Sequence, residues 1–138
     1  APPLQAVDIN FGDQIALAGW RARGTQFAPG DAIPIELLWR AISRPAADYT
    51  VFVHLRRVDN GAQVSANDSA PLNGAAPTSG WQPGQVFTDT RGIQIPPNAA
   101  PGVYRVIIGL YRFPSFERLR VMNGSETEHA LTEVIVGP

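Results

Sequence analysis

The dipeptide Pro-Gly occurs at positions 29–30, 83–84 and 101–102, and each copy precedes a segment with strand-like spacing of apolar residues. Proline fixes the backbone φ that the second position of a type II turn requires, and glycine accepts the positive φ of the third position. Each pair therefore predicts a tight turn that leads into a strand. The strands expected after these turns cover residues 33–41, 85–95 and 103–112.

The segment after the third turn is the most apolar of the chain, and it predicts a central strand. In an extended chain, alternate residues point to opposite sides. One side of this segment carries Tyr104, Val106, Ile108 and Leu110, and the other carries Val103, Ile107 and Tyr111. A tyrosine two residues after a glycine turn also has the spacing of the tyrosine corner of immunoglobulin-like domains. We therefore expect an all-β, immunoglobulin-like antiparallel β-sandwich of about seven to nine strands in two sheets.

Residues 49–66 predict a β-hairpin with its turn at Asn60-Gly61. A two-residue turn pairs Leu55 with Ala66 and Arg57 with Val64, and it places the apolar side of the first strand in the core. That side consists of Val51, Val53 and Leu55. A three-residue loop with Gly61 in a bulge is the alternative, and it pairs Val58 with Ala62 instead.

The length of 138 residues suits a single domain. Residues 1–7 contain two prolines and no periodicity, so we expect a linker there and a single β-sandwich domain over residues 8–138. Within that domain, Asp8–Phe11 reads as a short edge strand. Arg91-Gly92 interrupts the apolar pattern of the strand expected at 85–95. Apolar residues alternate over 33–39, and we expect the last of the four, Trp39, in the core.

Composition and spacing exclude several classes of function. The net charge of −1 and the absence of any run of Lys or Arg argue against nucleic acid and anionic membrane surfaces as partners. The chain has no cysteine, and its two histidines, His54 and His129, lack metal-ligand spacing. We therefore expect no catalytic residues, no metal and no cofactor, and hence no enzyme. A hydrolase, the least favoured class, would need a cleft with convergent titratable groups around His54 or His129.

Residues 67–84 form the longest stretch without periodicity, and long loops in compact domains often carry function. Trp81 lies there between a glycine and Gln82, so its ring is a candidate platform for a sugar, with Asp68 and Asn67 as neighbouring ligand-binding candidates. The alternative is that Trp81 folds back as a lid over one end of the sandwich. Trp20 is undecided between a packed outer face and an exposed platform.

The order of several short motifs is similar to that of a known bacterial domain. These are Phe11-Gly12-Asp13-Gln14-Ile15 through Trp20, Pro29-Gly30-Asp31 through Ala41, residues 49–55, residues 78–84, and Pro101-Gly102-Val103-Tyr104 through Tyr111. The chain resembles the β-sandwich domain appended after the membrane-spanning part of bacterial glycosyltransferase-like proteins of the protein-mannosyltransferase type. The resemblance implies an extracytoplasmic, cell-envelope accessory domain without catalytic residues of its own, in a parent protein that is membrane-anchored.

Two functions follow as expectations. The first is a non-catalytic accessory or interaction domain of a larger cell-envelope protein, whose partner is a glycan or another part of that protein. The alternative is a carbohydrate-binding module that uses loop aromatics around Trp81.

Overall fold

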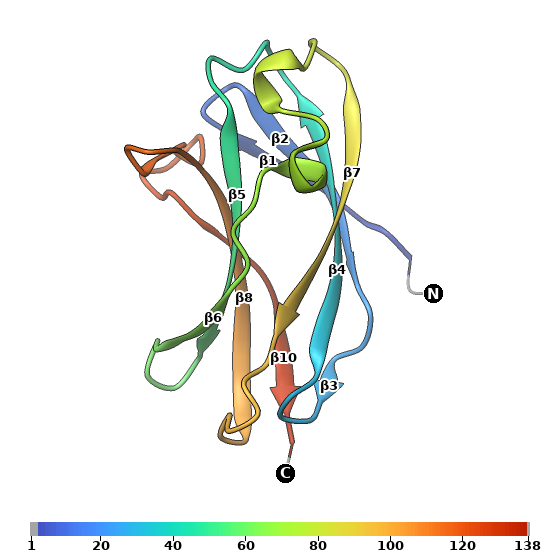
Figure 1. The fold of residues 1–138 in the computed structure, drawn as a ribbon, viewed down its shortest axis with the longest axis vertical. Coiled ribbons are helices and arrows are strands. Elements are labelled where there is room, and N and C mark those ends of the chain that lie inside the picture. The colour runs from blue at the N-terminus through green and yellow to red at the C-terminus, as the bar shows by residue number, and fades with distance from the viewer. Residues whose placement is uncertain (1–2, 138) are drawn as a thin grey trace.

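The computed structural model describes residues 3–137 and consists of two β-sheets packed face to face (Figure 1). Sheet A contains, in spatial order, β1 (Gln5–Phe11), β2 (Ile15–Ala22), β4 (Ala32–Ala41) and β7 (Val86–Gln94). Sheet B contains β3 (Gln26–Phe27), β10 (His129–Val136), β8 (Gly102–Arg112), β5 (Tyr49–Arg57) and β6 (Gln63–Ala66), and β9 (Glu117–Arg118) pairs with β8. Every strand pairing except that of β3 with β10 is antiparallel.

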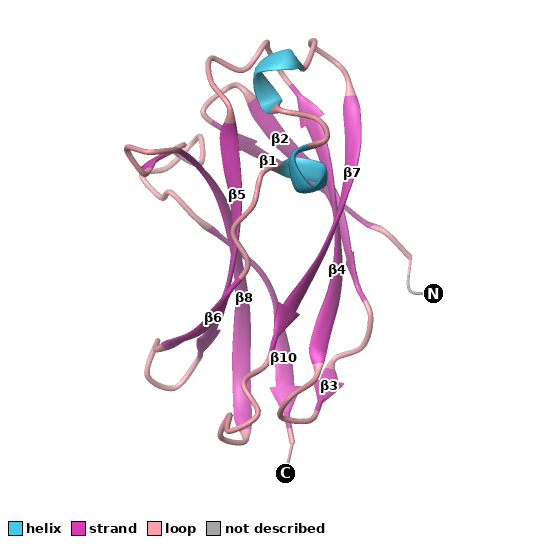
Figure 2. Ribbon diagram, in the orientation of Figure 1, coloured by secondary structure: helices cyan, strands magenta, loops and turns pink. Residues whose placement is uncertain are grey.

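The helical part of residues 3–137 consists of two short 3₁₀ helices, η1 (Pro71–Gly74) and η2 (Thr78–Gly80), which lie in the upper half of the view, one below the other (Figure 2). No helix within the described residues is long and apolar enough to cross a membrane.

The expected antiparallel β-sandwich is confirmed. Eight of the ten strands have at least four residues, within the predicted range of strand number. The order β2-β4-β7 in sheet A and β10-β8-β5-β6 in sheet B is an immunoglobulin-like order. The tyrosine corner is formed as well, because the Tyr104 hydroxyl donates a hydrogen bond of 2.7 Å to the Ala100 carbonyl.

The core lies between the sheets and is made by the alternate residues of their strands. Trp39 is completely buried, as predicted, and so are Val51, Val53 and Leu55. Trp20, undecided from sequence, is partly buried and packs against this core. The apolar alternation therefore identified the inward side of the long strands correctly.

Two of the three Pro-Gly pairs form the predicted turn. Gly30 has a φ of 91° and Gly84 a φ of 86°, and the residue after each glycine donates to the carbonyl three positions before it. The prediction is wrong for the third pair. Gly102 has a φ of 148° and is already paired with Val136 in sheet B, so β8 begins within the expected turn.

The two-residue register predicted for the hairpin at residues 49–66 is wrong, and the register of the three-residue alternative holds only away from the turn, where His54 pairs with Ala66. Leu55 pairs with Ser65, and the Arg57 amide donates to the Ala62 carbonyl. A bulge between the Leu55 and Arg56 pairs shifts the register, and Gly61 has a φ of 72° in a loop longer than either prediction. The turn is where the Asn60-Gly61 signal predicted it, and the bulge beside it changes the register.

Two further boundaries differ from expectation. Strand β1 starts at Gln5, inside the predicted linker at residues 1–7, because Gln5 and Ala6 pair with Trp20 and Gly19 of β2. Residues 1 and 2 of that linker lie outside the described residues. Strand β7 runs through the expected interruption without a break, since Arg91 and Gly92 pair with Ile35 and Pro34.

Candidate functional site

The predicted site residues Asn67 and Asp68 lie on opposite sides of one extended segment. Backbone hydrogen bonds join Asn67 to Val53 in both directions, so the segment continues along β5 beyond the end of β6. The Asn67 side-chain amide donates to the Gly92 carbonyl of sheet A at 2.7 Å. Asp68, the next residue, faces the outer side of sheet B. The alternation of an extended chain therefore separates the two side chains, and they do not form one site.

Trp81 is not a platform in this structure. Its side chain is 1% exposed, its indole N–H donates to the Ala76 carbonyl at 3.0 Å, and its ring stacks on Phe87 with the ring centres 4.4 Å apart. The prediction that it binds a sugar is not supported, because a buried indole has no free face. Its placement corresponds to the alternative, a lid at one end of the sandwich. The structure thus brings Trp81 together with neither Asp68 nor Asn67.

Asp68 instead belongs to a cluster on the outer face of sheet B. One of its carboxylate oxygens accepts a hydrogen bond of 3.1 Å from the Tyr111 hydroxyl of β8. The other lies 3.4 Å from Nε2 of His54 on β5. Burial, and hydrogen bonding to Asp68, raise the pKa of Tyr111, so its phenol keeps the proton it donates.

His54 in this cluster is uncharged at neutral pH. Burial lowers its pKa, and the nearby guanidinium groups of Arg56 and Arg118 act in the same direction. The attraction of Asp68 opposes them without reversing the shift. The neutral imidazole of His54 can therefore donate and accept hydrogen bonds beside the Asp68 carboxylate without adding a charge.

The ring of Phe52 forms the buried floor of the same face. It lies 4.7 Å from the His54 ring and 6.2 Å from the Tyr111 ring, and the Arg118 guanidinium lies over it at 4.3 Å. The floor requires a glycine on the neighbouring strand, because a Cβ added at Gly109 would come within 2.2 Å of the Phe52 ring. This face therefore consists of packed aromatic rings bordered by charged groups.

An aromatic tip extends this face outward at the turn between β8 and β9. The tip consists of Tyr111, Phe113 and Phe116. The Tyr111 and Phe116 ring centres are 5.3 Å apart, and those of Phe113 and Phe116 are 5.7 Å apart. Phe113 is 64% exposed and Phe116 61% exposed, and the segment projects away from the sandwich at the left of Figure 1.

The conformation of the tip is fixed by the hairpin. Tyr111 pairs with Arg118 and Arg112 with Glu117, and the Phe116 amide donates to the Arg112 carbonyl at 2.7 Å. Phe116 has a φ of 62°, a conformation that costs a residue with a side chain about 1–2 kcal/mol. Sequence reasoning missed these two phenylalanines. The available signal was a Phe-Pro-Ser-Phe turn directly after the most apolar strand.

A second part of the outer face carries ion pairs beside two hollows. Arg56 holds Glu128 through two hydrogen bonds of 2.5 and 2.9 Å, and Arg118 adds a contact of 3.2 Å. These bonds hold the pKa of Glu128 below its usual value, since they favour the anion. Both hollows are lined in part by Glu126 and Glu128; one also includes His129, whose pKa burial lowers.

These hollows bear on the possibility of hydrolysis at His129. A carboxyl with a lowered pKa, such as that of Glu128, is a poor proton donor. His129, like His54, is uncharged at neutral pH and so has no proton to donate as an acid. Among the described residues, no group of three or more His, Cys, Asp or Glu side chains is arranged to hold a metal ion. The bonds from Arg56 and Arg118 hold Glu128 as an anion at the edge of both hollows.

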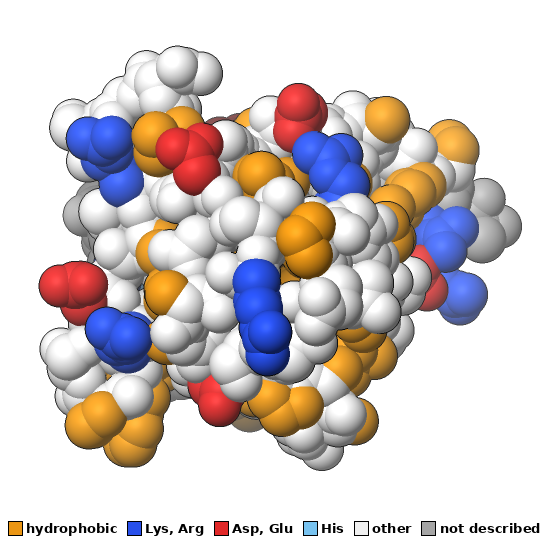
Figure 3. Space-filling model, turned by 90° about the horizontal axis from the view of Figure 1, so that it is seen from above, with side chains coloured by type: hydrophobic (Ala, Val, Ile, Leu, Met, Phe, Trp, Pro, Cys, Tyr) orange, Lys and Arg blue, Asp and Glu red, His pale blue; other side chains and the backbone are white. Residues whose placement is uncertain are grey.

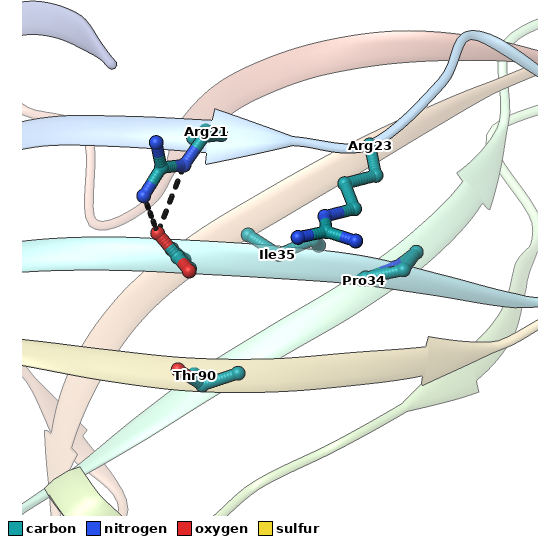
Figure 4. A pocket seen from close by; sticks show the side chains of 6 residues that line it. Arg21, Arg23, Pro34, Ile35 and Thr90 are labelled. Atoms are coloured by element: carbon teal, nitrogen blue, oxygen red, sulfur yellow. Dashed lines mark hydrogen bonds and ion pairs between the residues drawn. The ribbon is translucent and has the colours of Figure 1, made fainter. Parts of the chain in front are cut away.

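A further hollow of about 200 Å³ lies on sheet A, lined by Arg21, Arg23, Pro34, Ile35, Glu36 and Thr90 (Figure 4). Both Nε and Nη2 of Arg21 bond Glu36, and Arg23 extends over β4 toward Pro34 and Ile35. Viewed from above, charges of both signs are interspersed with small apolar groups, without a face of one sign (Figure 3).

No protein-family model matches the chain, and no curated protein matches it. Among solved structures, the β-glucosidase from Listeria innocua in complex with glucose is 17% identical, with a TM-score of 0.48 over 86% of this chain. The complex of the same enzyme with gluconolactone is 18% identical, with a TM-score of 0.47. The chain spans only 16% of the length of these structures, and a likeness this remote tells nothing about what the chain binds.

Proposed function

We propose that this chain is a non-catalytic accessory domain that binds a partner through the outer face of sheet B. The aromatic tip carries the proposal. Soluble domains rarely expose neighbouring large apolar side chains without a use, and such patches mark interaction sites. Here two phenylalanine rings more than 60% exposed lie against each other, and one of them is in a costly backbone conformation. Backbone strain of this kind is found most often at binding and active sites.

The chemistry of the surrounding face supports binding rather than turnover. Glu128 is engaged by Arg56 and Arg118, and Asp68 by Tyr111. Groups held in such pairs orient a surface and discriminate between partners. A catalytic acid or base, in contrast, needs a pKa near the working pH, and the shifts of His54 and Glu128 lead away from it.

A stability measurement tests whether the tip is a binding surface or a structural element. We expect the variant Phe113→Ser/Phe116→Gly to keep its free energy of unfolding within about 1 kcal/mol, because exposed rings contribute little and glycine relieves the positive φ. The matched control is Phe87→Ser, whose ring packs on Trp81 and whose loss should cost about 2–4 kcal/mol. Urea unfolding followed by tryptophan fluorescence measures both. A loss in the tip variant as large as in the control would show that the rings are structural, and the proposal would fail.

We further propose that the domain belongs to a larger cell-envelope protein of the glycosyltransferase-like kind that its motif order resembles. Pro29-Gly30, Pro83-Gly84 and the tyrosine corner at Tyr104, which carry much of that resemblance, all have defined roles in the fold. The gene sequence on either side of this domain tests the placement. Membrane-spanning segments directly upstream are the expected finding, whereas a cytosolic enzyme domain there would contradict it.

A further inference from the structure

We infer that the aromatic tip and Asp68 together bind a neutral carbohydrate; this rests on the proposed function and adds the class of ligand. The tip residues Tyr111, Phe113 and Phe116 supply ring faces and edges, and Asp68 supplies a carboxylate at one end of the row. Sugar rings have an apolar side made of C–H groups and a rim of hydroxyl groups. A surface with aromatic rings next to a carboxylate acceptor matches both sides of such a ligand.

The connection between the rings and the carboxylate is direct. Asp68 bonds the Tyr111 hydroxyl at 3.1 Å, and the Tyr111 ring is 5.3 Å from that of Phe116. The Asp68 side chain is 33% exposed, so its oxygens retain open acceptor positions besides those facing Tyr111 and His54. An ionised carboxylate accepts hydrogen bonds from hydroxyl groups more strongly than a neutral acceptor does.

The charges at the tip favour a sugar over a lipid surface. The tip carries charges of both signs: the Asp68 carboxylate bonds Tyr111, Glu117 follows Phe116 in the chain, and Arg112 and Arg118 lie on the same hairpin. Insertion of the rings into a bilayer would therefore carry anions as well as cations toward the headgroups. That costs desolvation energy and, at anionic lipids, repulsion. Membrane-binding surfaces instead surround their apolar residues with basic ones. A neutral glycan has no charge to be repelled and offers hydroxyl donors to the same carboxylates.

Binding to defined oligosaccharides tests the inference. The probes are cellohexaose, laminarihexaose, mannohexaose and chitohexaose, each titrated into the labelled protein and followed by the amide shifts of residues 109–118 in NMR spectra. We expect at least one probe to bind, with shifts concentrated at the tip. Phe113→Ser/Phe116→Gly, the same tip variant, should weaken that binding at least about tenfold, and Asp68→Asn several-fold.

Two control variants keep the result specific. Val86→Ser removes an apolar side chain that is 52% exposed on sheet A, and Glu133→Gln removes a carboxylate paired with Arg105 at 2.7 Å. Neither should change the binding. Equal weakening by the control variants, or no binding of any probe at millimolar concentration, would overturn the inference. So would binding of phosphatidylcholine or phosphatidylglycerol vesicles that depends on the two phenylalanines.

The outcome is separable from that of the proposed function. If the tip variant keeps its stability but no probe binds, the tip is still a binding surface and only its assignment to carbohydrate fails. If the tip variant unfolds, the proposed function itself fails. In that case the effect of Asp68→Asn on oligosaccharide binding still tests the carbohydrate inference, because Asp68 is not part of the strained turn.

Discussion

The guanidinium of Arg91 and the carboxylate of Asp89 lie 3.0 Å apart in the interior of the sandwich, on the inward side of β7. Arg91 donates to the Val51 carbonyl of β5 and to the carbonyls of Asn67, Ser69 and Ala70. Asp89 accepts from the Leu72 amide. The pair thus joins β7 of sheet A to the segment that follows β6, where no strand pairing connects the two sheets. It also fixes the segment from which Asp68 reaches the outer face.

Arg91→Ala should destabilise the fold by about 3–5 kcal/mol, because it leaves Asp89 buried without its charge partner and several carbonyls without a donor. Urea unfolding measures the loss. In the double variant Asp89→Leu/Arg91→Met the buried charge is absent, so the total cost should be smaller than the sum of the single costs. A loss under about 1 kcal/mol in Arg91→Ala would contradict the role given to this pair.

Tyr104→Phe should cost about 1–2 kcal/mol. The variant removes the bond of 2.7 Å to Ala100 and the bond of 3.0 Å from Arg57, both around a side chain that is 1% exposed. Tyr111→Phe is the matched control, since its hydroxyl bonds Asp68, whose side chain is 33% exposed. Its cost should be under about 1 kcal/mol in the same thermal unfolding experiment. Equal costs would argue against the tyrosine corner as a stabilising element here.

Gly109→Ala should destabilise strongly, by at least about 2–3 kcal/mol, because the added Cβ would meet the Phe52 ring at 2.2 Å and the Thr127 carbonyl at 3.1 Å. Gly92→Ala, on β7, meets no atom within 4 Å and should be neutral or slightly stabilising. Phe52→Leu combined with Gly109→Ala should recover part of the loss. If Gly109→Ala is as stable as Gly92→Ala, the packing assigned to Phe52 is wrong.

Stability should fall as the pH drops below 6.5. The folded-state pKa of His54 is below its ordinary value of 6.5, mainly through burial, so the unfolded chain binds a proton that the folded state resists. The stability that depends on a neutral His54 is fully present above pH 6.5, and it is lost as the pH falls toward the pKa of His54 in the folded state. His129 contributes with the same sign. Glu128 does not act in this window, because its pKa is lowered from 4.5 and it stays ionised.

Urea unfolding at about pH 7.5 and about pH 5.5 checks this dependence. His54→Gln should reduce the difference in free energy of unfolding between the two conditions, and His129→Gln should reduce it independently. The groups that face His54 are Asp68, Arg56, Arg118 and the Phe52 ring. A difference that is unchanged in His54→Gln would show that another group governs it.

The residues of the proposed carbohydrate site show how much of it could be predicted from the sequence. The sequence singled out Asp68 as a ligand-binding candidate but grouped it with Trp81 and Asn67, whereas in the structure it bonds Tyr111. Their separation follows from the alternation of residues 67 and 68 and from the contact of Trp81 with Phe87. The alternation of residues 67 and 68 could be inferred only once this segment was known to continue along β5. The contact of Trp81 with Phe87 depends on the position of β7.

The sequence by itself determined the local features. Alternation placed Trp39, Val53 and Val106 in the core, and the Pro-Gly pairs at 29–30 and 83–84 set two turns, because side-chain period and allowed φ are properties of neighbouring residues. Only the tertiary structure decided the contact of Asp68 with Tyr111 and the inward position of Arg91. These depend on which distant strands pack together, since a polar side chain enters the interior only where partners from elsewhere in the chain satisfy it.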